Sequence, residues 1–167
     1  MNKKLLILTI ILALGVLGLA GCGKSLSDRI TESLIEKSTG GQADVNTNDG
    51  NIKINVEGTS IETGNNVSLP KDFPSDVYLP SNNLLSAMTS EKSYTISLEV
   101  KETPAEIFAI YKQKVANSGW KIVTSGDFGG MQTISAEKDN RILSIIVSPG
   151  QESRTTVVLS EYLKDQE

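Results

Sequence analysis

The sequence contains no histidine, a single cysteine and a single tryptophan, and aromatic residues make up only 5% of it. Without histidine or a second cysteine, Ser-His-Asp, Cys-His and zinc sites cannot form, and an internal disulfide bond is excluded. Acidic residues outnumber basic ones, 20 to 16, and no basic patch with interleaved aromatics occurs. This charge balance argues against nucleic acid as a partner.

Motifs that carry other chemistry are present only as fragments. Ser-x-x-Lys occurs at 118–121 and 135–138, but we expect the first at a helix end and the second in a strand, where residues i and i+3 point in opposite directions. The Gly-rich stretch 126–130 has no helix behind it that would complete a phosphate site. The stretch that begins at Asn46 lies in a strand pattern, unlike a calcium loop between helices. We therefore predict a protein that is not an enzyme and holds no metal or cofactor.

The N-terminus has the three parts of a secretory signal peptide: basic residues, an apolar run and small residues at its end. Lys3 and Lys4 precede the apolar run 5–20, which is shorter than the roughly 20 residues of a membrane-spanning helix. An uncleaved membrane anchor is therefore the less favoured alternative. The run closes with Leu19-Ala20-Gly21-Cys22, a sequence that resembles the lipobox of bacterial lipoproteins.

The lipobox resemblance implies cleavage between Gly21 and Cys22 and a covalent lipid, such as palmitate, on the Cys22 sulfur. Two or more acyl chains give durable attachment, so we expect an extracytoplasmic domain that is lipid-anchored to a bacterial membrane. The domain would face outward from the plasma membrane, or lie at the outer membrane of a double-membraned cell, since Gly23 stands where inner-membrane lipoproteins carry aspartate. The expected partners are the membrane, through the anchor, and another protein of the cell envelope.

The remainder of the chain changes composition several times. Apolar residues recur at helical spacing between Leu26 and Ile35 and predict a short helix that ends at Gly40-Gly41. This helix either docks on a partner or on the membrane surface, or it is a spacer that packs loosely on its own domain. Alternating apolar residues on both sides of Asn48–Asn51 predict a hairpin. The expected layout is a signal peptide over 1–21, a lipid-anchored tether and short helix over 22–41, a short β-hairpin segment over 42–69, a proline-containing connector over 70–91 and an α+β domain over 92–163.

Three of the five prolines fall between Leu69 and Pro80. Proline fixes its own φ and keeps the preceding residue extended, so this segment is expected to run straight. Its apolar side chains include Phe73 and Tyr78. They either dock in a groove of a partner, as proline-rich ligands do, or lie against the protein's own domain.

The most regular pattern follows residue 92. Apolar and polar residues alternate from Tyr94 to Val100 and predict a half-buried strand. Thr103-Pro104-Ala105-Glu106 then combines a threonine N-cap, a proline at the first helical position and a glutamate at the third, which predicts a helix start. Gly119 should end this helix in the left-handed conformation, and Trp120 should pack back on its last turn. The stripe expected to be buried comprises Ile107, Ile110, Tyr111 and Val115, with Phe108 on its flank.

Four strands should follow this helix, over 121–125, 131–138, 142–148 and 154–162, with a loop at 126–130. The order is then β-α-β-β-β-β. The predicted fold class is α+β, with one amphipathic helix packed on a mainly antiparallel sheet and preceded by a short helix and a small β-hairpin segment.

Tyr111-Lys112 followed by Gly119-Trp120 is similar to a helix of uncharacterised bacterial lipoproteins, in which it also precedes an antiparallel sheet. That resemblance implies no activity. We predict a non-enzymatic protein-interaction module whose surface is the open edge of the sheet together with Pro70–Pro80. The alternative is a binding protein for a small apolar or peptide ligand held between helix and sheet. The candidate contact residues are Phe73, Tyr78, Tyr94, Phe108 and Tyr111.

Overall fold

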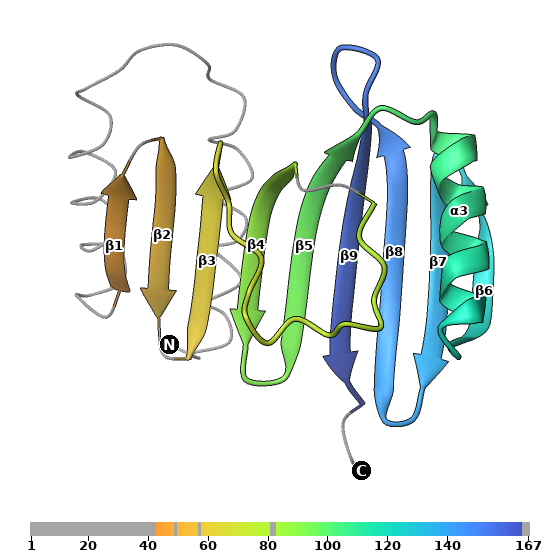
Figure 1. The fold of residues 1–167 in the computed structure, drawn as a ribbon, viewed down its shortest axis with the longest axis horizontal. Coiled ribbons are helices and arrows are strands. Elements are labelled where there is room, and N and C mark those ends of the chain that lie inside the picture. Colours follow the sequence, from red (N-terminus) through yellow and green to blue (C-terminus); the bar gives the residue numbers. More distant parts are fainter. Residues whose placement is uncertain (1–42, 49, 57, 81–82, 165–167) are drawn as a thin grey trace.

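The computed structural model describes residues 43–48, 50–56, 58–80 and 83–164, and within them nine β-strands and one α-helix (Figure 1). The strands form one sheet in the order β1-β2-β3-β4-β5-β9-β8-β7-β6, and every neighbouring pair is antiparallel. The helix, α3 (Pro104–Asn117), follows β5. The strands are β1 Ala43–Asn48, β2 Asn51–Val56, β3 Thr59–Gly64, β4 Leu84–Ser90, β5 Ser93–Val100, β6 Lys121–Phe128, β7 Met131–Lys138, β8 Arg141–Pro149 and β9 Thr155–Leu163.

The predicted fold class was wrong. The expected hairpin segment and the end of the expected connector supply β1 to β4, which belong to the same sheet as the strands of the expected α+β domain. α3 has its main contacts with β6, β7 and β8, so it covers one end of a large sheet. The error has a physical cause, because the pairing of β3 with β4 closes a long loop and leaves no mark in local periodicity. The short helix predicted before Gly40 and Cys22, the predicted site of lipidation, lie outside the described residues.

Two meanders make up the sheet, β1 to β5 and β6 to β9. α3 carries the chain from the end of β5 to the far edge, where β6 begins, and the second meander returns until β9 pairs with β5 (Figure 1). The hairpin predicted around Asp139-Asn140 is confirmed, with Lys138 opposite Arg141 and Asp139 at φ +52°. β5 and β9, which are distant in sequence, therefore join the two parts of the sheet.

α3 begins and ends as its sequence predicts. The Thr103 hydroxyl accepts a hydrogen bond from the Glu106 backbone N–H, and the Glu106 carboxylate accepts one from the Thr103 backbone N–H at 2.9 Å. At the other end Gly119 has φ +81°, and the Trp120 N–H donates to the Val115 carbonyl, as in a Schellman motif. The buried residues of the helix are Ile107, Tyr111 and Val115, while Ile110 and Phe108 are partly buried.

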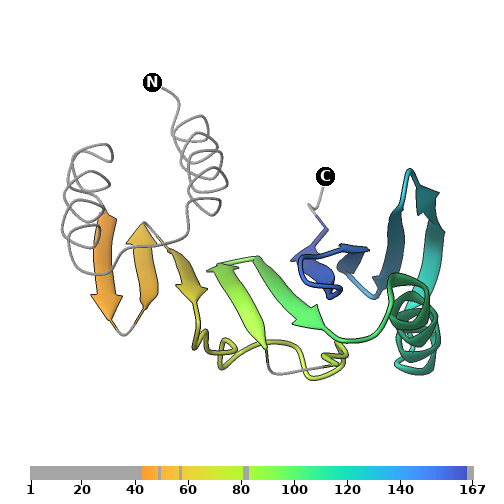
Figure 2. The same ribbon diagram turned by 90° about the horizontal axis from the view of Figure 1, so that it is seen from above.

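Residues 65–80, which we call the strap, cross the sheet on the same side as α3 (Figure 2). They form turns rather than a strand: the Phe73 N–H donates to the Pro70 carbonyl at 3.1 Å, and the Val77 N–H donates to the Pro74 carbonyl at 3.2 Å. Val77 is buried in the main core. The strap therefore lies against its own domain, which was one of the two alternatives that the proline spacing left open.

The main hydrophobic core lies between the sheet and the layer that the strap and α3 form. Ile96, Leu159, Ile145 and Ile134 lie opposite one another in the successive registers of β5, β9, β8 and β7. Each of these four side chains is at most 1% exposed. Trp120, predicted to fill the core behind the helix, is 3% exposed and belongs to the same cluster.

A second, smaller hydrophobic cluster lies over β1 to β3 on the opposite face of the sheet. In the strand register Ile54 lies opposite Ile61, and Ile61 lies opposite Met88. Met88 in turn lies opposite Thr95, which precedes the core residue Ile96 and so points away from α3 and the strap. The members of this cluster are Val45 and Ile54, which are buried, and Ile52, Val56 and Ile61, which are partly buried.

Two strands differ from the sequence-based expectation. β4 carried no prediction, because a bulge at Leu85 interrupts its alternation of apolar and polar residues. The loop expected over 126–130 was wrong in its first part, since β6 continues to Phe128. Only Gly129 and Gly130 make the turn, and both have positive φ.

Candidate binding surfaces

Four of the five predicted contact residues meet in two aromatic pairs, each with one partner from the strap. Phe73 and Tyr94 lie edge to face, with ring centroids 5.8 Å apart and an interplanar angle of 82°. Tyr78 and Tyr111 lie 5.6 Å apart at 69°. Phe108 belongs to neither pair. The strap side chains therefore occupy the place at which a ligand between helix and sheet was predicted.

Two donors beneath the strap have no hydrogen-bond partner among the described residues: the Tyr111 hydroxyl and the Trp120 indole N–H. The two side chains are 1% and 3% exposed. Burial, with a further contribution from Tyr78, raises the pKa of the Tyr111 phenol, which therefore keeps its proton. A buried polar group without a partner costs about 1–3 kcal/mol. These donors would suit the acceptor atoms of a bound molecule.

A charged cluster at one end of β7 and β8 fastens the strap. Asp76 accepts hydrogen bonds from Lys138 Nζ at 2.7 Å and from the two terminal nitrogens of Arg141 at 3.0 and 2.5 Å. Lys138 also donates to the Ser118 carbonyl at 2.9 Å, and the Arg141 guanidinium lies 4.8 Å from the Trp120 ring centroid. We call Asp76, Lys138 and Arg141 the clamp. It ties the strap, the end of α3 and the β7–β8 hairpin together.

The carboxylates at the clamp have perturbed pKa values. Hydrogen bonds from Arg141, with those from Lys138 and against a smaller effect of burial, lower the pKa of Asp76 from 3.8 to about 2. Burial raises the pKa of Glu161, whose carboxylate lies 3.8 Å from Arg141. Perturbed carboxylates often mark catalytic sites. Here they form ion pairs with Arg141, which is partly buried, so the perturbation of the two pKa values follows from the packing of the fold.

β5 to β9 have one face that points away from α3 and the strap, and we call it the open face (Figure 2). The strand registers place no charged side chain across its centre. Thr95 and Ser160, whose hydroxyl oxygens are 3.2 Å apart, begin a row in which every strand contributes a serine or threonine. Small uncharged side chains cost less to desolvate than lysine or glutamate. This face therefore suits contact with another surface. The row is Thr95, Ser160, Ser144, Ser135 and Thr124, and the row beside it is Ser97, Val158, Ile146, Thr133 and Gly126.

Three large apolar side chains stand at the rim of the open face. Phe128, Met131 and Tyr162 are 62%, 47% and 41% exposed. A side chain added at Gly126 would meet the Phe128 ring at 3.3 Å, which places this ring over the open face. β6 is also an end strand of the described sheet, and Val123 at its bulge is 54% exposed.

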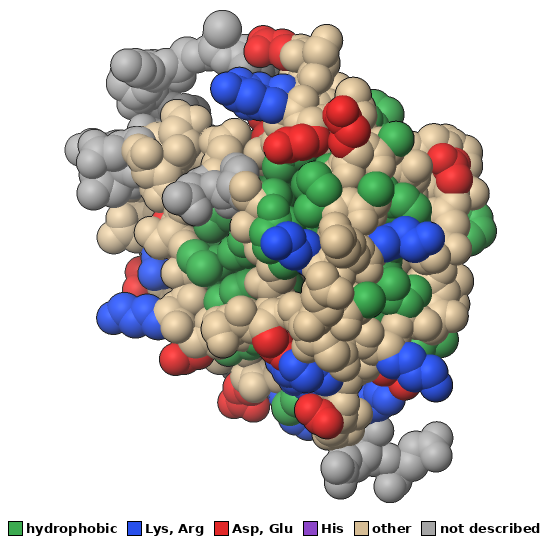
Figure 3. All heavy atoms as spheres, turned by 45° about the vertical axis from the view of Figure 1, so that its right-hand side comes forward, with side chains coloured by type: hydrophobic (Ala, Val, Ile, Leu, Met, Phe, Trp, Pro, Cys, Tyr) green, Lys and Arg blue, Asp and Glu red, His purple; other side chains and the backbone are tan. Residues whose placement is uncertain are grey.

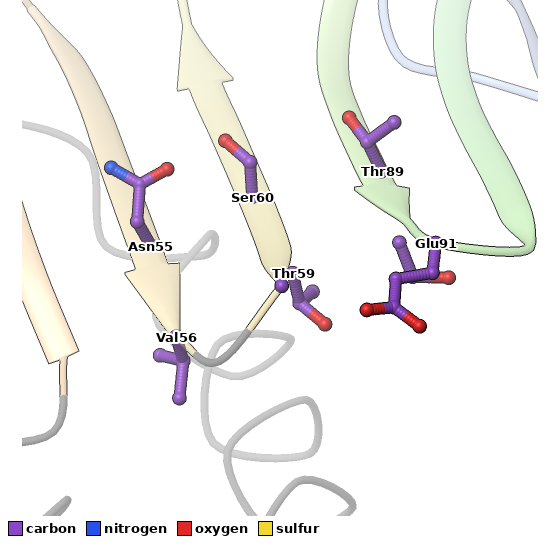
Figure 4. A pocket seen from close by; sticks show the side chains of 8 residues that line it. Asn55, Val56, Thr59, Ser60, Thr89 and Glu91 are labelled. Atoms are coloured by element: carbon purple, nitrogen blue, oxygen red, sulfur yellow. The ribbon is translucent and has the colours of Figure 1, made fainter.

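Among the described residues, three hollows lie outside the aromatic region, and most of the residues that line them have polar side chains, whereas typical ligand pockets are lined mainly by apolar and aromatic ones. One of about 520 Å³ lies over β1 to β3 and is lined by asparagines with Asp44, Lys53 and Glu62. Another of about 410 Å³ lies where the β2–β3 and β4–β5 turns meet, and Figure 4 shows Thr59 and Glu91 on facing sides of it. The third, of about 230 Å³, lies beside Glu99–Glu102 and Arg154.

The side of the molecule that carries α3 shows apolar side chains interrupted by lysine, arginine and acidic side chains (Figure 3).

Within the described ranges, no group of three or more cysteine and acidic side chains is placed to hold a metal ion. None of the helices in those ranges is both long and apolar enough to cross a membrane.

A family model described as START domain-like matches residues 84–157. The match begins at the first residue of β4, includes α3 and ends within β9, so it takes in the strands of the open face and leaves out β1 to β3 and the strap. It spans less than half of the chain. No curated protein and no solved structure matches this chain. The similarity concerns this part of the fold, and membership of a lipoprotein family stays a prediction.

Sequence reasoning missed the clamp and the open face. Nothing near Asp76 in the sequence points to Lys138 or Arg141, which lie more than sixty positions away. The open face did leave a signal. The polar positions of β5, β7, β8 and β9 are mostly serine and threonine where a solvated sheet would also carry lysine and glutamate.

Proposed function

We propose that this chain is a lipid-anchored, extracytoplasmic module of the bacterial envelope that binds another envelope protein and catalyses no reaction. The lipobox-like Leu19–Cys22 supports the anchor. The lack of histidine and the engagement of Asp76 and Glu161 in ion pairs support a non-enzymatic role. The observation that carries the binding role is the open face, which has no charge across its centre and three exposed apolar side chains at its rim.

The open face and the β6 edge together define the proposed surface. Exposed apolar side chains that gather on one face are characteristic of interaction sites. An end strand also offers unpaired backbone N–H and C=O groups, to which a partner's strand adds by hydrogen bonding. We therefore propose that the partner pairs a strand with β6 and rests on the open face beside Phe128 and Met131.

The strap takes no part in this surface, although Pro70–Pro80 was predicted to belong to it. Val77 is buried in the main core and Asp76 is held by the clamp. The strap also lies on the α3 side of the sheet, away from the open face (Figure 2). The proposed surface is thus the sheet edge together with the opposite face.

Site-specific photo-crosslinking in cells tests the proposal. A photoreactive side chain is placed at Phe128 or Met131 in the tagged, lipidated chain, and at Leu69, which is exposed but belongs to the strap. We expect one dominant envelope protein to be captured from positions 128 and 131 and not from position 69. Capture of the same proteins from all three positions, or of none, would contradict the proposal.

Two variants sharpen this experiment. Ser144→Lys places a charge in the middle of the open face and should abolish capture, because a desolvated charge without a partner is costly. Cys22→Ser removes the lipid and should leave the protein soluble, with capture lost or strongly reduced. The far-UV circular dichroism spectrum and Trp120 fluorescence of both variants should match the parent, which establishes that the fold is intact.

A small apolar or peptide ligand is the second candidate, and the buried donors of Tyr111 and Trp120 favour it. Because Tyr78 contacts Tyr111, such a ligand requires the strap to move. Native mass spectrometry of the purified mature chain tests this function, with Asp76→Asn as a variant whose clamp is loosened. A ligand mass should be retained by the wild type and change in occupancy in Asp76→Asn. The absence of any added mass in both proteins would exclude it.

A further inference from the structure

The apolar face of β1 to β3 is covered, although the strap and α3 lie on the other side of the sheet. Val45 is 9% exposed and Ile54 is 1% exposed, and both share this face with Ile61. β2 has its main contacts with β1 and β3. None of the described elements therefore lies over Ile54.

The open face provides an internal control for this burial. Ile146 and Val158 point to the same side of the sheet from interior strands, with a strand on each side of them, yet both remain partly exposed. Flanking strands alone do not bury a side chain in the middle of a sheet face. Ile54 must therefore be covered by a further part of the chain.

The stretch that precedes β1 matches this face in position, length and chemistry. It ends where β1 begins, at Ala43. Ten residues from Leu26 to Ile35 span about 15 Å as a helix, close to the about 20 Å of a six-residue strand. Between residues 22 and 42 three basic residues, Lys24, Arg29 and Lys37, balance three acidic ones, Asp28, Glu32 and Glu36. Its apolar stripe consists of Leu26, Ile30, Leu34 and Ile35.

We propose that the segment Leu26–Ile35 docks, through this apolar stripe, on the face formed by Val45, Ile54 and Ile61. A membrane or a second copy of the chain would leave Ile54 exposed in the single chain, whereas this segment buries it within one molecule. The apolar face of β1 to β3 is thus the docking site of the protein's own tether.

Docking of the tether would fix how the module stands on the membrane, an extension that rests on the proposed lipid anchor. Fully extended, residues 23–42 reach at most about 70 Å from the lipid, but with the segment docked only residues 23–25 remain as slack, about 10 Å. The membrane would then lie beside β1. Eight strand spacings of about 4.8 Å place β6 about 40 Å away at the far end of the sheet, where it stays accessible to a partner.

Thiol labelling tests the docking without membrane or partner. In the mature chain carrying Cys22→Ser, Val45→Cys supplies the only thiol, and its rate of reaction with a maleimide is measured. We expect slow labelling that becomes faster by about tenfold or more when Ile30→Asn and Leu34→Asn break the stripe. Glu32→Gln with Glu36→Gln, on the opposite side of the predicted helix, should leave the rate unchanged.

Val158→Cys on the open face is the positional control. It should react with the maleimide at the same rate in the chain with the unaltered stripe, in the Ile30→Asn, Leu34→Asn variant and in the Glu32→Gln, Glu36→Gln variant. Equal rates at Val45→Cys with and without the stripe would overturn the inference, as would protection that fades on dilution, because a second copy would then supply the cover. The labelling assay contains no lipid or partner, so a negative labelling result would overturn the docking inference without bearing on the proposed anchor or partner. A negative crosslinking result would overturn the proposed partner without bearing on the docking.

Discussion

The two parts of the sheet bury opposite faces. In β4 to β9 the strap and α3 cover one face, and on the other side β5 to β9 present the open face, whose centre carries no charge. In β1 to β3 the apolar side chains Val45, Ile54 and Ile61 point to the side of the open face, while Asp44, Lys53 and Glu62 point to the side of the strap. One continuous sheet thus changes its buried face between β3 and β4. The change is possible because side chains alternate along every strand, so each face needs only its own cover.

The exposed faces of the two parts also differ. Over β1 to β3 the polar face carries charges and asparagines and is solvated. Over β5 to β9 the open face carries serine, threonine, valine and isoleucine and no central charge. A face built to remain in water tolerates charges, whereas a face that will be covered avoids them, because a charge is expensive to desolvate. The comparison therefore supports the proposal that the open face is an interaction surface.

Matched substitutions in the two hydrophobic clusters, one in β4 to β9 and one in β1 to β3, should give the largest change in stability. Ile145 and Ile54 are the same residue type with almost no exposure. Ile145→Ala, in the larger core, should lower the free energy of unfolding by about 4 kcal/mol. The cavity that it leaves would be enclosed by the sheet and by the layer of strap and α3, which relax little to fill it. Ile54→Ala should cost about 2 kcal/mol, because a small cluster collapses more readily. Urea unfolding of the lipid-free mature chain measures both values.

Two probes of the same unfolding refine this test. Trp120 fluorescence reports the larger core, and far-UV circular dichroism reports the whole sheet. In Ile54→Ala we expect the circular dichroism transition to begin at lower urea than the fluorescence transition, because β1 to β3 open first. Coincident transitions and equal losses in both variants would show that the sheet behaves as one cooperative unit.

The clamp should contribute an intermediate effect that depends on pH. Asp76→Asn should lower the free energy of unfolding by about 2 kcal/mol near neutral pH, since it removes charge-assisted hydrogen bonds that are partly buried. The pKa of Asp76 is lower in the folded protein than in the unfolded chain. The contribution of Asp76 to the free energy of unfolding is therefore complete above about pH 3.8 and is lost as the pH falls through about 2.

The difference between wild type and Asp76→Asn isolates this pH effect. Glu161 acts in the opposite sense, because its raised pKa favours the protonated form in the fold. Subtracting the variant's stability from that of the wild type at each pH removes most of this contribution. A difference that stays constant from pH 6 down to about pH 2 would contradict the role assigned to the clamp.

Tyr111→Phe should have the smallest effect. The Tyr111 hydroxyl is buried without a partner among the described residues, so its removal should leave stability unchanged or raise it by about 1 kcal/mol. The ring and its contact with Tyr78 are preserved. Thermal unfolding of the two proteins measures the difference. A loss of stability instead would mean that the hydroxyl has an acceptor, such as a bound ligand, and would strengthen the second candidate function.

Local features of the sequence predicted the elements whose contacts are local. The Thr103–Glu106 capping box and the Gly119 terminus define α3, and the turn at Asp139-Asn140 defines the β7–β8 hairpin. The burial of Trp120 followed from its place after the helix. β4 escaped prediction because of its bulge, and the separate hairpin segment was a wrong expectation because no local pattern reveals the pairing of Ile61 with Met88.

By itself the sequence determined α3 and most of the strands, though not β4, since caps, turns and alternation act over a few residues. Its composition also excluded imidazole chemistry and an internal disulfide. Only the tertiary structure decided which face each part of the sheet buries, where the strap lies and which residues meet in the clamp. Asp76 and Arg141 meet because β4, β5 and β9 bring distant segments together. Alternating side chains are equally compatible with either face until such a cover is in place.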